Sequence, residues 1–181
     1  LPKVIRGIYK ALEVGLSPVK INSVIIKGIN DSQILPLAQM SVYLPVMVRF
    51  IEYCPTSMYT KPAGDYVPTS NIREIIERKL GPLSTVLAGD ADGPASYFKI
   101  KHSAGLLGFI SGKSSMFCQL CSRLRLTSDG KIKPCLYSSQ CYDIKKLIRT
   151  NADDKDLLKL LKKILCEKSN YTKLNSPAGE F

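Results

Sequence analysis

The stretch Phe117–Leu136 reads FCQLCSRLRLTSDGKIKPCL. We expect the rest of the chain to be organised around it. Cys118 and Cys121 are separated by two residues, a spacing at which a tight turn can direct two thiolates at one metal. The pair Asp129-Gly130 accepts the positive φ angles of a hairpin turn, and short strand patterns lie on both sides of it. The second strand therefore brings Cys135 back toward the first two cysteines, so three thiolates are expected to converge.

Three cysteines leave part of a metal site open. A closed structural zinc site uses four protein ligands, and an iron–sulfur cluster normally takes four cysteines unless one iron is kept for another ligand. Strand alternation predicts that Arg123 and Arg125 lie on one face, a few residues from the metal. An open metal beside two guanidinium groups suits an anionic ligand that carries a base, such as a nucleotide.

Spacing alone also allows a structural zinc site in which Cys141 is the fourth ligand. Zinc ribbons usually show a second Cys-x-x-Cys pair rather than the wider spacing from Cys135 to Cys141. Such a zinc knuckle would fit a non-enzymatic module that binds nucleic acid through its basic surface. However, residues 123–133 have no aromatic side chain interleaved with the basic ones, so they offer no platform on which bases could stack.

Composition places the chain among globular proteins with a basic surface. Its 181 residues include 26 Lys and Arg against 15 Asp and Glu, a net charge of +11 that favours polyanionic ligands. Six cysteines without a secretory signal peptide indicate a metal site in a reducing compartment, and no apolar run reaches transmembrane length. The chain opens at Leu1 without an initiator Met, so we expect it to be a fragment.

Apolar periodicity predicts an alternation of helices and strands in the first part of the chain. The predicted order is a helix at 3–14, a strand at 19–26, a helix from the turn at 28–32 to about residue 44, and a strand at 46–52. This order is typical of a parallel α/β sheet or barrel. Beyond a Pro- and Gly-rich linker we expect a helix with a capping box at Asn71 and Glu74, short strands at 83–87, 97–100 and 106–110, and helices at 142–149 and 153–168.

Two cations lie inside the apolar strands. Lys20 and Arg49 are each flanked by apolar residues, and a buried charge is costly unless it faces a cavity or a partner. Both side chains could snorkel to the surface or pair with Glu52 or Asp31. In a barrel they could instead face a ligand near the C-terminal ends of the strands.

The motif Phe117-Cys118-x-x-Cys121-x-Arg123-Leu124-Arg125-Leu126-Thr127-x-Asp129-Gly130-Lys131-x-x-Pro134-Cys135-Leu136 closely resembles the C-terminal cluster motif of the MoaA family, the radical S-adenosylmethionine GTP 3′,8-cyclases of molybdenum cofactor biosynthesis. The segments around Lys20 and Arg49 resemble the last barrel strands of that family. The resemblance implies the C-terminal part of a radical S-adenosylmethionine (β/α) barrel at residues 1–58 and an α+β cluster and GTP-binding domain at 59–181.

The resemblance also assigns residues. It implies that Cys118, Cys121 and Cys135 hold a [4Fe-4S] cluster whose free iron binds guanine. It further implies GTP contacts from the four cations Lys20, Arg49, Arg123 and Arg125. Cys54, which ends a strand near the presumed site, is the candidate for a contact with S-adenosylmethionine, although a buried thiol there needs no role.

The activity that the resemblance implies is conversion of GTP to (8S)-3′,8-cyclo-7,8-dihydroguanosine 5′-triphosphate. An N-terminal cluster would cleave S-adenosylmethionine, but its Cys-x-x-x-Cys-x-x-Cys motif is not in this chain, so we expect the chain alone to be inactive. The chain ends in SPAGEF at residues 176–181 rather than in the family's Gly-Gly tail, so either the C-terminus is truncated or altered, or the radical-initiating tail has been lost. Further expectations are a homodimer, no nucleic acid or membrane partner, cyclic pyranopterin synthase as the next enzyme, and a cytoplasmic location, or a mitochondrial one in a eukaryote.

Overall fold

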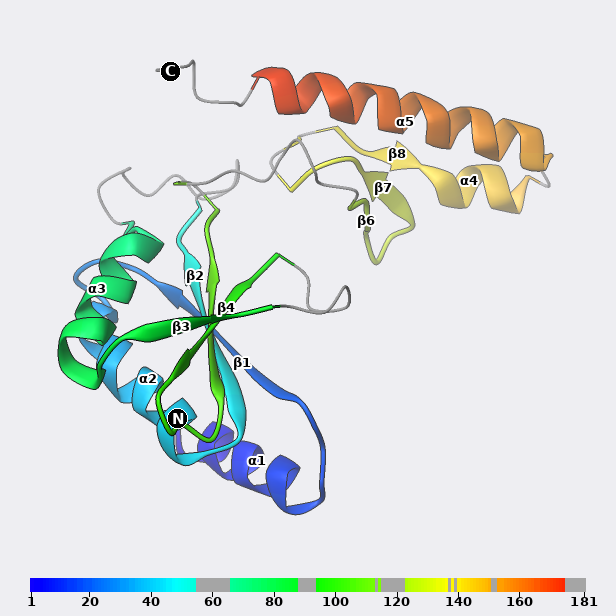
Figure 1. Cartoon of the computed structure of the whole chain (residues 1–181). Coiled ribbons are helices and arrows are strands. Elements are labelled where there is room, and N and C mark those ends of the chain that lie inside the picture. Colours follow the sequence, from blue (N-terminus) through cyan, green and yellow to red (C-terminus); the bar gives the residue numbers. More distant parts are fainter. Residues whose placement is uncertain are drawn as a thin grey trace. The chain divides into compact units, whose positions relative to one another are not determined.

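The computed structural model describes residues 1–54, 66–87, 94–112, 114, 123–136, 138, 140–150 and 153–174, with side chains of the last helix as far as residue 168. The chain divides into two compact units, which are described separately (Figure 1). The first comprises Leu1–Cys54 and Pro62–Ser115, and the second Pro55–Lys61 and Met116–Phe181. The domain boundary predicted between residues 58 and 59 lies outside the described residues, and the units are divided differently from the predicted domains.

The first unit is a mixed α/β structure. Along the chain its elements are α1 (Pro2–Glu13), β1 (Val19–Ile25), the short 3-10 helix η1 (Asp31–Gln33), α2 (Ile34–Tyr43), β2 (Val46–Glu52), α3 (Thr69–Leu80), β3 (Leu83–Val86), β4 (Ser96–Ile100) and β5 (Leu106–Ile110). The predicted helices and strands of residues 3–52 and the three short strands that follow are therefore confirmed, with ends shifted by one or two residues.

The five strands of this unit form one sheet in the order β1-β2-β5-β4-β3. β1, β2 and β5 are parallel, whereas β4 pairs antiparallel with β5 and β3 antiparallel with β4. The sheet therefore combines the predicted parallel strands with the three short strands that we had expected in the following domain. The α/β class is confirmed in this mixed form.

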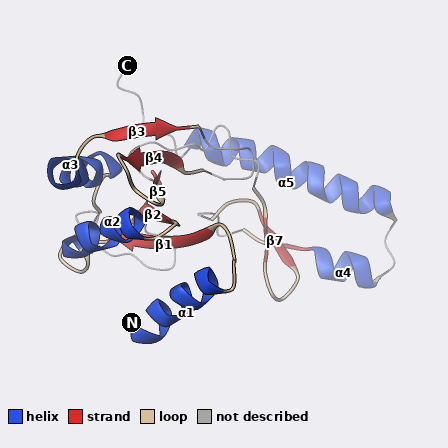
Figure 2. Ribbon diagram, turned by 60° about the horizontal axis from the view of Figure 1, so that its bottom comes forward, coloured by secondary structure: helices blue, strands red, loops and turns tan. Residues whose placement is uncertain are grey.

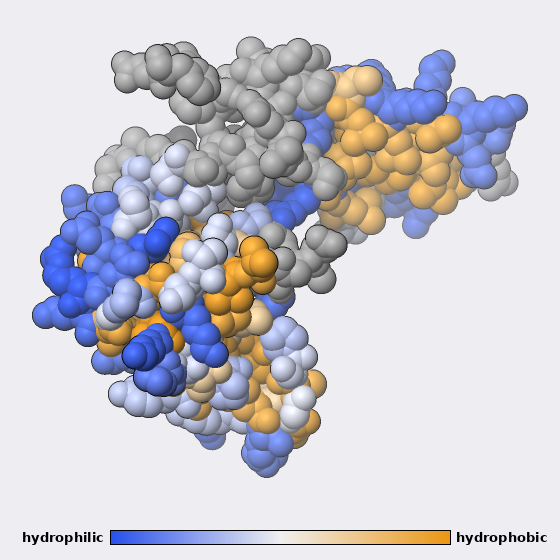
Figure 3. Space-filling model, in the orientation of Figure 1, coloured by the Kyte–Doolittle hydropathy of each residue, from blue (hydrophilic) through white to orange (hydrophobic). Residues whose placement is uncertain are grey.

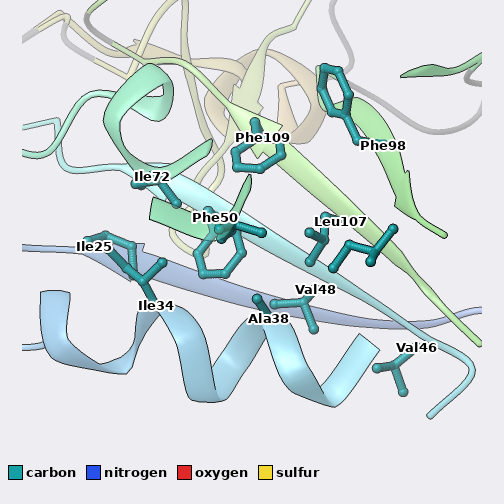
Figure 4. Packing of buried hydrophobic residues seen from close by; sticks show 12 residues of the cluster. Ile25, Ile34, Ala38, Val46, Val48, Phe50, Ile72, Phe98, Leu107 and Phe109 are labelled. Atoms are coloured by element: carbon teal, nitrogen blue, oxygen red, sulfur yellow. The ribbon is translucent and has the colours of Figure 1, made fainter. Parts of the chain in front are cut away.

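The hydrophobic core lies on one face of the sheet, under α2 and α3 (Figure 2). Alternation along β2 buries Val46, Val48 and Phe50 on this face, and Figure 4 shows Val48 beside Ala38 and Phe50 near Ile34, both on α2. The ring of Phe50 stacks on that of Phe109 of β5, with centroids 5.8 Å apart. On β2 the opposite face of the sheet carries Met47, Arg49 and Ile51.

Helix α3 begins two residues earlier than its predicted capping box. Its first residue is Thr69, and Asn71 lies inside the helix, so the predicted cap at Asn71 is wrong. The amide of Thr69 instead donates a hydrogen bond of 2.8 Å to the carboxylate of Glu52, which is 1% exposed. A buried side chain from another element thus satisfies the helix N-terminus, a cap that local sequence does not reveal.

The second unit contains a three-stranded antiparallel sheet and two helices. Its elements are β6 (Arg125–Leu126), β7 (Lys131–Lys133), β8 (Tyr142–Asp143), α4 (Ile144–Arg149) and α5 (Asp154–Leu174), with strand order β6-β7-β8. Asp143 caps α4 by accepting a 2.8 Å hydrogen bond from the amide of Lys146. Apolar side chains lie on the surface of α4 and α5, among them Ile148, Leu158 and Leu165 (Figure 3).

Among the described helices, none is long and apolar enough to cross a membrane.

Candidate functional site

The hairpin predicted at Asp129-Gly130 is present. Arg125 pairs with Lys133 and Leu126 with Ile132, and Gly130 has the positive φ of 83° that the turn requires. A Cβ at this glycine would lie 2.7 Å from Cβ of Lys145, so the turn also depends on a close approach to α4. The hairpin prediction from sequence is therefore confirmed.

An ion pair at the turn stabilises the hairpin locally. Nζ of Lys131 lies 2.7 Å from Oδ2 of Asp129, and the hydroxyl of Thr127 donates to Oδ1 of the same carboxylate. Hydrogen bonds from Lys131 and Thr127 lower the pKa of Asp129 from 3.8 to about 2. The same carboxylate raises the pKa of Lys131. The carboxylate of Asp129 therefore has a structural role in the turn.

The two strands of the hairpin place like charges opposite each other. Arg125 and Lys133 are direct partners in the register, and both are half-buried. Like charges directly opposite each other on a sheet are destabilising. Within the described residues, neither cation has a carboxylate partner. Lys133, which we did not predict as a site residue, therefore joins Arg125 in a cationic pair that an anion would stabilise.

Arg123 lies just before β6, with its side chain exposed. Its carbonyl oxygen accepts a hydrogen bond from the ammonium group of Lys168 in α5, a lysine that is only 7% exposed. The helix thus holds the backbone at the start of the hairpin. The two-residue length of β6 leaves Arg123 outside the regular strand, so the predicted shared strand face with Arg125 remains a prediction.

The predicted cysteine site falls only partly within the described residues. Cys135 lies two residues after β7, half-buried and without a disulfide, whereas Cys118 and Cys121 lie outside the described part of the chain. The described residues contain no group of three His, Cys, Asp or Glu side chains around one point. Cys141, the alternative fourth ligand, is exposed immediately before β8. Convergence of the three thiolates remains a prediction.

In the first unit, Arg49 lies on the sheet face opposite the core. Its Nε donates a 2.7 Å hydrogen bond to Oδ1 of Asn22 on β1, and its Nη1 lies 3.5 Å from the hydroxyl of Tyr97 on β4. Glu52 alternates to the core face and binds Thr69 and Ser114, so the predicted alternative pairing of Arg49 with Glu52 is wrong. Sequence analysis missed Asn22 and Tyr97, because only the sheet register brings them to Arg49.

The sheet face opposite the core, called the open face below, carries several cations. Lys20 lies two positions before Asn22 on β1 and Lys99 two positions after Tyr97 on β4, so both share the face of Arg49. Among the residues of the five described strands that alternate onto this face, there is no Asp or Glu. Charges of one sign on one surface attract anionic ligands. The register therefore brings Lys20 and Arg49 to one face, where Lys99 joins them, and their role as nucleotide ligands remains a prediction.

Cys54 lies two residues beyond β2 and is half-buried. A Cβ added at Gly112 would lie 2.3 Å from its Sγ, so the thiol packs directly against the backbone of the segment after β5. This contact gives Cys54 a packing role. Its predicted contact with S-adenosylmethionine remains a prediction.

Comparison with known proteins gives one family for most of this chain. Residues 46–174 match the family model described as Molybdenum Cofactor Synthesis C. The chain is 41% identical over 157 residues to the GTP 3′,8-cyclase of Pelotomaculum thermopropionicum, covering 86% of this chain and 48% of that protein. It is 39% identical over 164 residues to the GTP 3′,8-cyclase of Desulforamulus reducens, covering 90% and 50%. The corresponding protein of Rippkaea orientalis is 38% identical over 178 residues, covering 96% and 53%. The chain spans about half the length of the curated relatives that it matches.

Proposed function

Because the chain belongs to the Molybdenum Cofactor Synthesis C family, we propose that it holds GTP for the reaction of a GTP 3′,8-cyclase in molybdenum cofactor biosynthesis. The nucleotide is converted to (8S)-3′,8-cyclo-7,8-dihydroguanosine 5′-triphosphate by radical chemistry that depends on S-adenosylmethionine. The proposed contribution of this chain is binding and orientation, which can supply much of the barrier reduction when two atoms of one substrate must meet.

The observation that carries the proposal is the cationic pair of Arg125 and Lys133, opposite each other on the hairpin that leads into Cys135. Two cations without a carboxylate partner in the described residues favour an anionic ligand. A guanidinium group adds a planar fork that matches phosphate or carboxylate oxygens. A nucleoside triphosphate supplies the required negative charge.

We further propose that Cys118, Cys121 and Cys135 hold a [4Fe-4S] cluster. The donor set fits: Cys135 is a free thiol, half-buried at the end of the hairpin, and thiolates are the ligands that iron–sulfur clusters require. When bound, the cluster supplies an iron that three cysteines leave available to the guanine base. Arg123 and Arg125 then orient the nucleotide by charge-assisted hydrogen bonds, each contributing about 1.5 to 3 kcal/mol.

In the first unit, Lys20 and Arg49 are the proposed ligands of the nucleotide. Both share the open face of the sheet, where alternation places no carboxylate in the described strands. Nε of Arg49 already donates a hydrogen bond to Asn22, so the terminal nitrogens of the guanidinium are the groups that can donate to phosphate oxygens. Cys54 is proposed to lie near S-adenosylmethionine.

The finer fold assignment is also a proposal. The parallel pair β1 and β2, joined through α2, supports assignment of residues 1–58 to the end of a radical S-adenosylmethionine barrel. Residues 59–181 are proposed as the cluster and GTP-binding domain. The zinc-knuckle alternative receives no support from the family match or from the relatives.

The test of the proposed function is nucleotide binding to the anaerobically reconstituted chain. We expect a brown protein that binds GTP in a calorimetric titration, with much weaker binding of guanosine, which lacks the phosphates. A colourless protein that retains zinc after purification and binds single-stranded nucleic acid, but not GTP, would support the zinc knuckle and contradict the proposal.

A further inference from the structure

One row of residues runs across all five strands on the open face of the first unit's sheet. The register pairs Asn22 with Arg49, Arg49 with Gly108, Gly108 with Tyr97, and Tyr97 with Val86. Residues paired in this way lie side by side on the same face. Arg49 and Tyr97 are therefore separated by a single strand, and the residue between them is a glycine.

The glycine leaves the space that the arginine side chain occupies. A Cβ at Gly108 would lie 2.8 Å from Cγ of Arg49 and 3.1 Å from Cε1 of Tyr97. Cγ is near the backbone end of the arginine, so it cannot move aside without moving the guanidinium. Arg49 therefore passes over β5 through a slot that any larger residue at position 108 would close.

Tyr97 forms the far wall of this slot. Its side chain is only 2% exposed, and its hydroxyl lies 3.5 Å from Nη1 of Arg49. Asn22 holds Nε of the same guanidinium from the other side, at 2.7 Å. The plane of the guanidinium is thus defined by contacts at two of its three nitrogens, and within the described residues Nη2 has no partner.

We propose that Gly108 and Tyr97 are positioning residues that hold Arg49 ready for the phosphate groups of a nucleoside triphosphate. This inference rests on the proposed function, in which Arg49 is a nucleotide ligand. A free arginine side chain loses rotamer freedom when it binds, and a side chain that is already fixed loses less. Gly108 supplies the space and Tyr97 the wall, so both act on the ligand only through Arg49.

A double-mutant cycle on GTP affinity tests this inference. The dissociation constant for GTP is measured with the full chain, reconstituted anaerobically, for wild type, Tyr97→Phe, Gly108→Ala, Arg49→Ala, and each of the first two combined with Arg49→Ala. We expect Tyr97→Phe to weaken GTP binding by about three- to tenfold, the range of one lost hydrogen bond. Gly108→Ala should weaken it by at least as much, because the added Cβ displaces the side chain of Arg49. In the Arg49→Ala background neither change should weaken binding further, because the group through which they act is gone.

Gly7→Ala is the matched control, since a Cβ at Gly7 of α1 meets nothing within 4 Å. It should leave GTP affinity unchanged. If Gly108→Ala does not fold, Tyr97→Phe decides alone, because it keeps the ring and removes only the hydroxyl. A purely structural role would lower stability without coupling to Arg49 in GTP affinity.

The outcomes separate this inference from the proposed function. If Arg49→Ala weakens binding while Tyr97→Phe and Gly108→Ala bind GTP like wild type, the positioning role is overturned and Arg49 remains a ligand. The positioning role is also overturned if either change weakens binding by the same factor with and without Arg49. If Arg49→Ala itself binds GTP like wild type, the proposed role of Arg49 fails, and the inference fails with it.

Discussion

The ammonium group of Lys131 lies 2.7 Å from a carboxylate oxygen of Asp129, across the turn that joins β6 to β7. This ion pair and the hydroxyl of Thr127 hold the pKa of Asp129 at about 2, below its ordinary value of 3.8. A carboxylate with a lowered pKa in the folded state stabilises the fold at any pH above its unfolded value. The contribution is lost as the pH falls toward the folded value.

The first prediction concerns this pH dependence. Replacing Asp129 by Asn should lower the free energy of unfolding between pH 5 and 7, where the native carboxylate is charged and bonded. The difference from wild type should shrink below about pH 4 and be lost as the pH falls through about 2, where the wild-type carboxylate becomes protonated as well. Urea denaturation at a series of pH values measures it. A difference that is constant from pH 7 to pH 2 would contradict the role of the charge.

The second prediction concerns Glu52, a buried carboxylate on the core face of β2. It accepts hydrogen bonds from the amide of Thr69, at 2.8 Å, and from the amide of Ser114, at 2.9 Å. A Gln at this position would turn its NH₂ group toward one of these donors. We expect Glu52→Gln to lower the free energy of unfolding by about 2 to 4 kcal/mol, measured by urea denaturation.

Glu74 provides the matched control for Glu52. It forms an exposed pair with Arg78 at 2.6 Å, one turn along α3. Exposed pairs of this kind contribute about 0.3 to 0.5 kcal/mol, so Glu74→Gln should have little effect. Equal effects of the two substitutions would show that Glu52 does not hold α3 and the segment after β5 in place.

The third prediction concerns Lys133. Because this lysine lies opposite Arg125 on the hairpin, its removal should relieve repulsion in the empty protein and remove attraction for the nucleotide. We expect Lys133→Ala to weaken GTP binding by about three- to tenfold and to leave the unfolding free energy unchanged or slightly raised. Titration calorimetry and urea denaturation measure the two effects.

A lysine far from the hairpin in sequence, Lys159 on the exposed surface of α5, is the control for charge alone. Lys159→Ala removes the same charge from an exposed position outside the hairpin and should change GTP affinity by less than about twofold, since salt screens exposed charges. If both substitutions weaken binding equally, net charge rather than the hairpin determines the affinity.

Sequence predicted the parts of the fold that depend on local chemistry. Strand β2 was expected at 46–52 because an apolar run there is broken only by Arg49, and it has those bounds. The hairpin was expected from Asp129-Gly130, because few residues other than glycine accept the positive φ of that turn. The start of α3 was predicted wrongly, because its cap is the side chain of Glu52, seventeen positions before Thr69.

The parts that sequence missed depend on strand order. β5 lies between β2 and β4, which brings Tyr97 to Arg49 from 48 positions away in the sequence and Gly108 from still farther. No local pattern marks such neighbours. Lys133 was missed for the same reason, because only the hairpin register places it opposite Arg125. The cysteine spacing, in contrast, was clear in the sequence, although Cys118 and Cys121 lie outside the described residues.

The most direct test of the central proposal is the iron content and GTP affinity of the Cys135→Ala variant, with Cys166→Ala as control. Cys166 is an exposed thiol on α5, outside the proposed ligand set. After anaerobic reconstitution, wild type and Cys166→Ala should hold about four iron atoms per chain and bind GTP, as one [4Fe-4S] cluster requires. Cys135→Ala should lose most of its iron and its tight GTP binding. Full iron content in Cys135→Ala, or GTP binding that is unchanged without the cluster, would contradict the three-cysteine site.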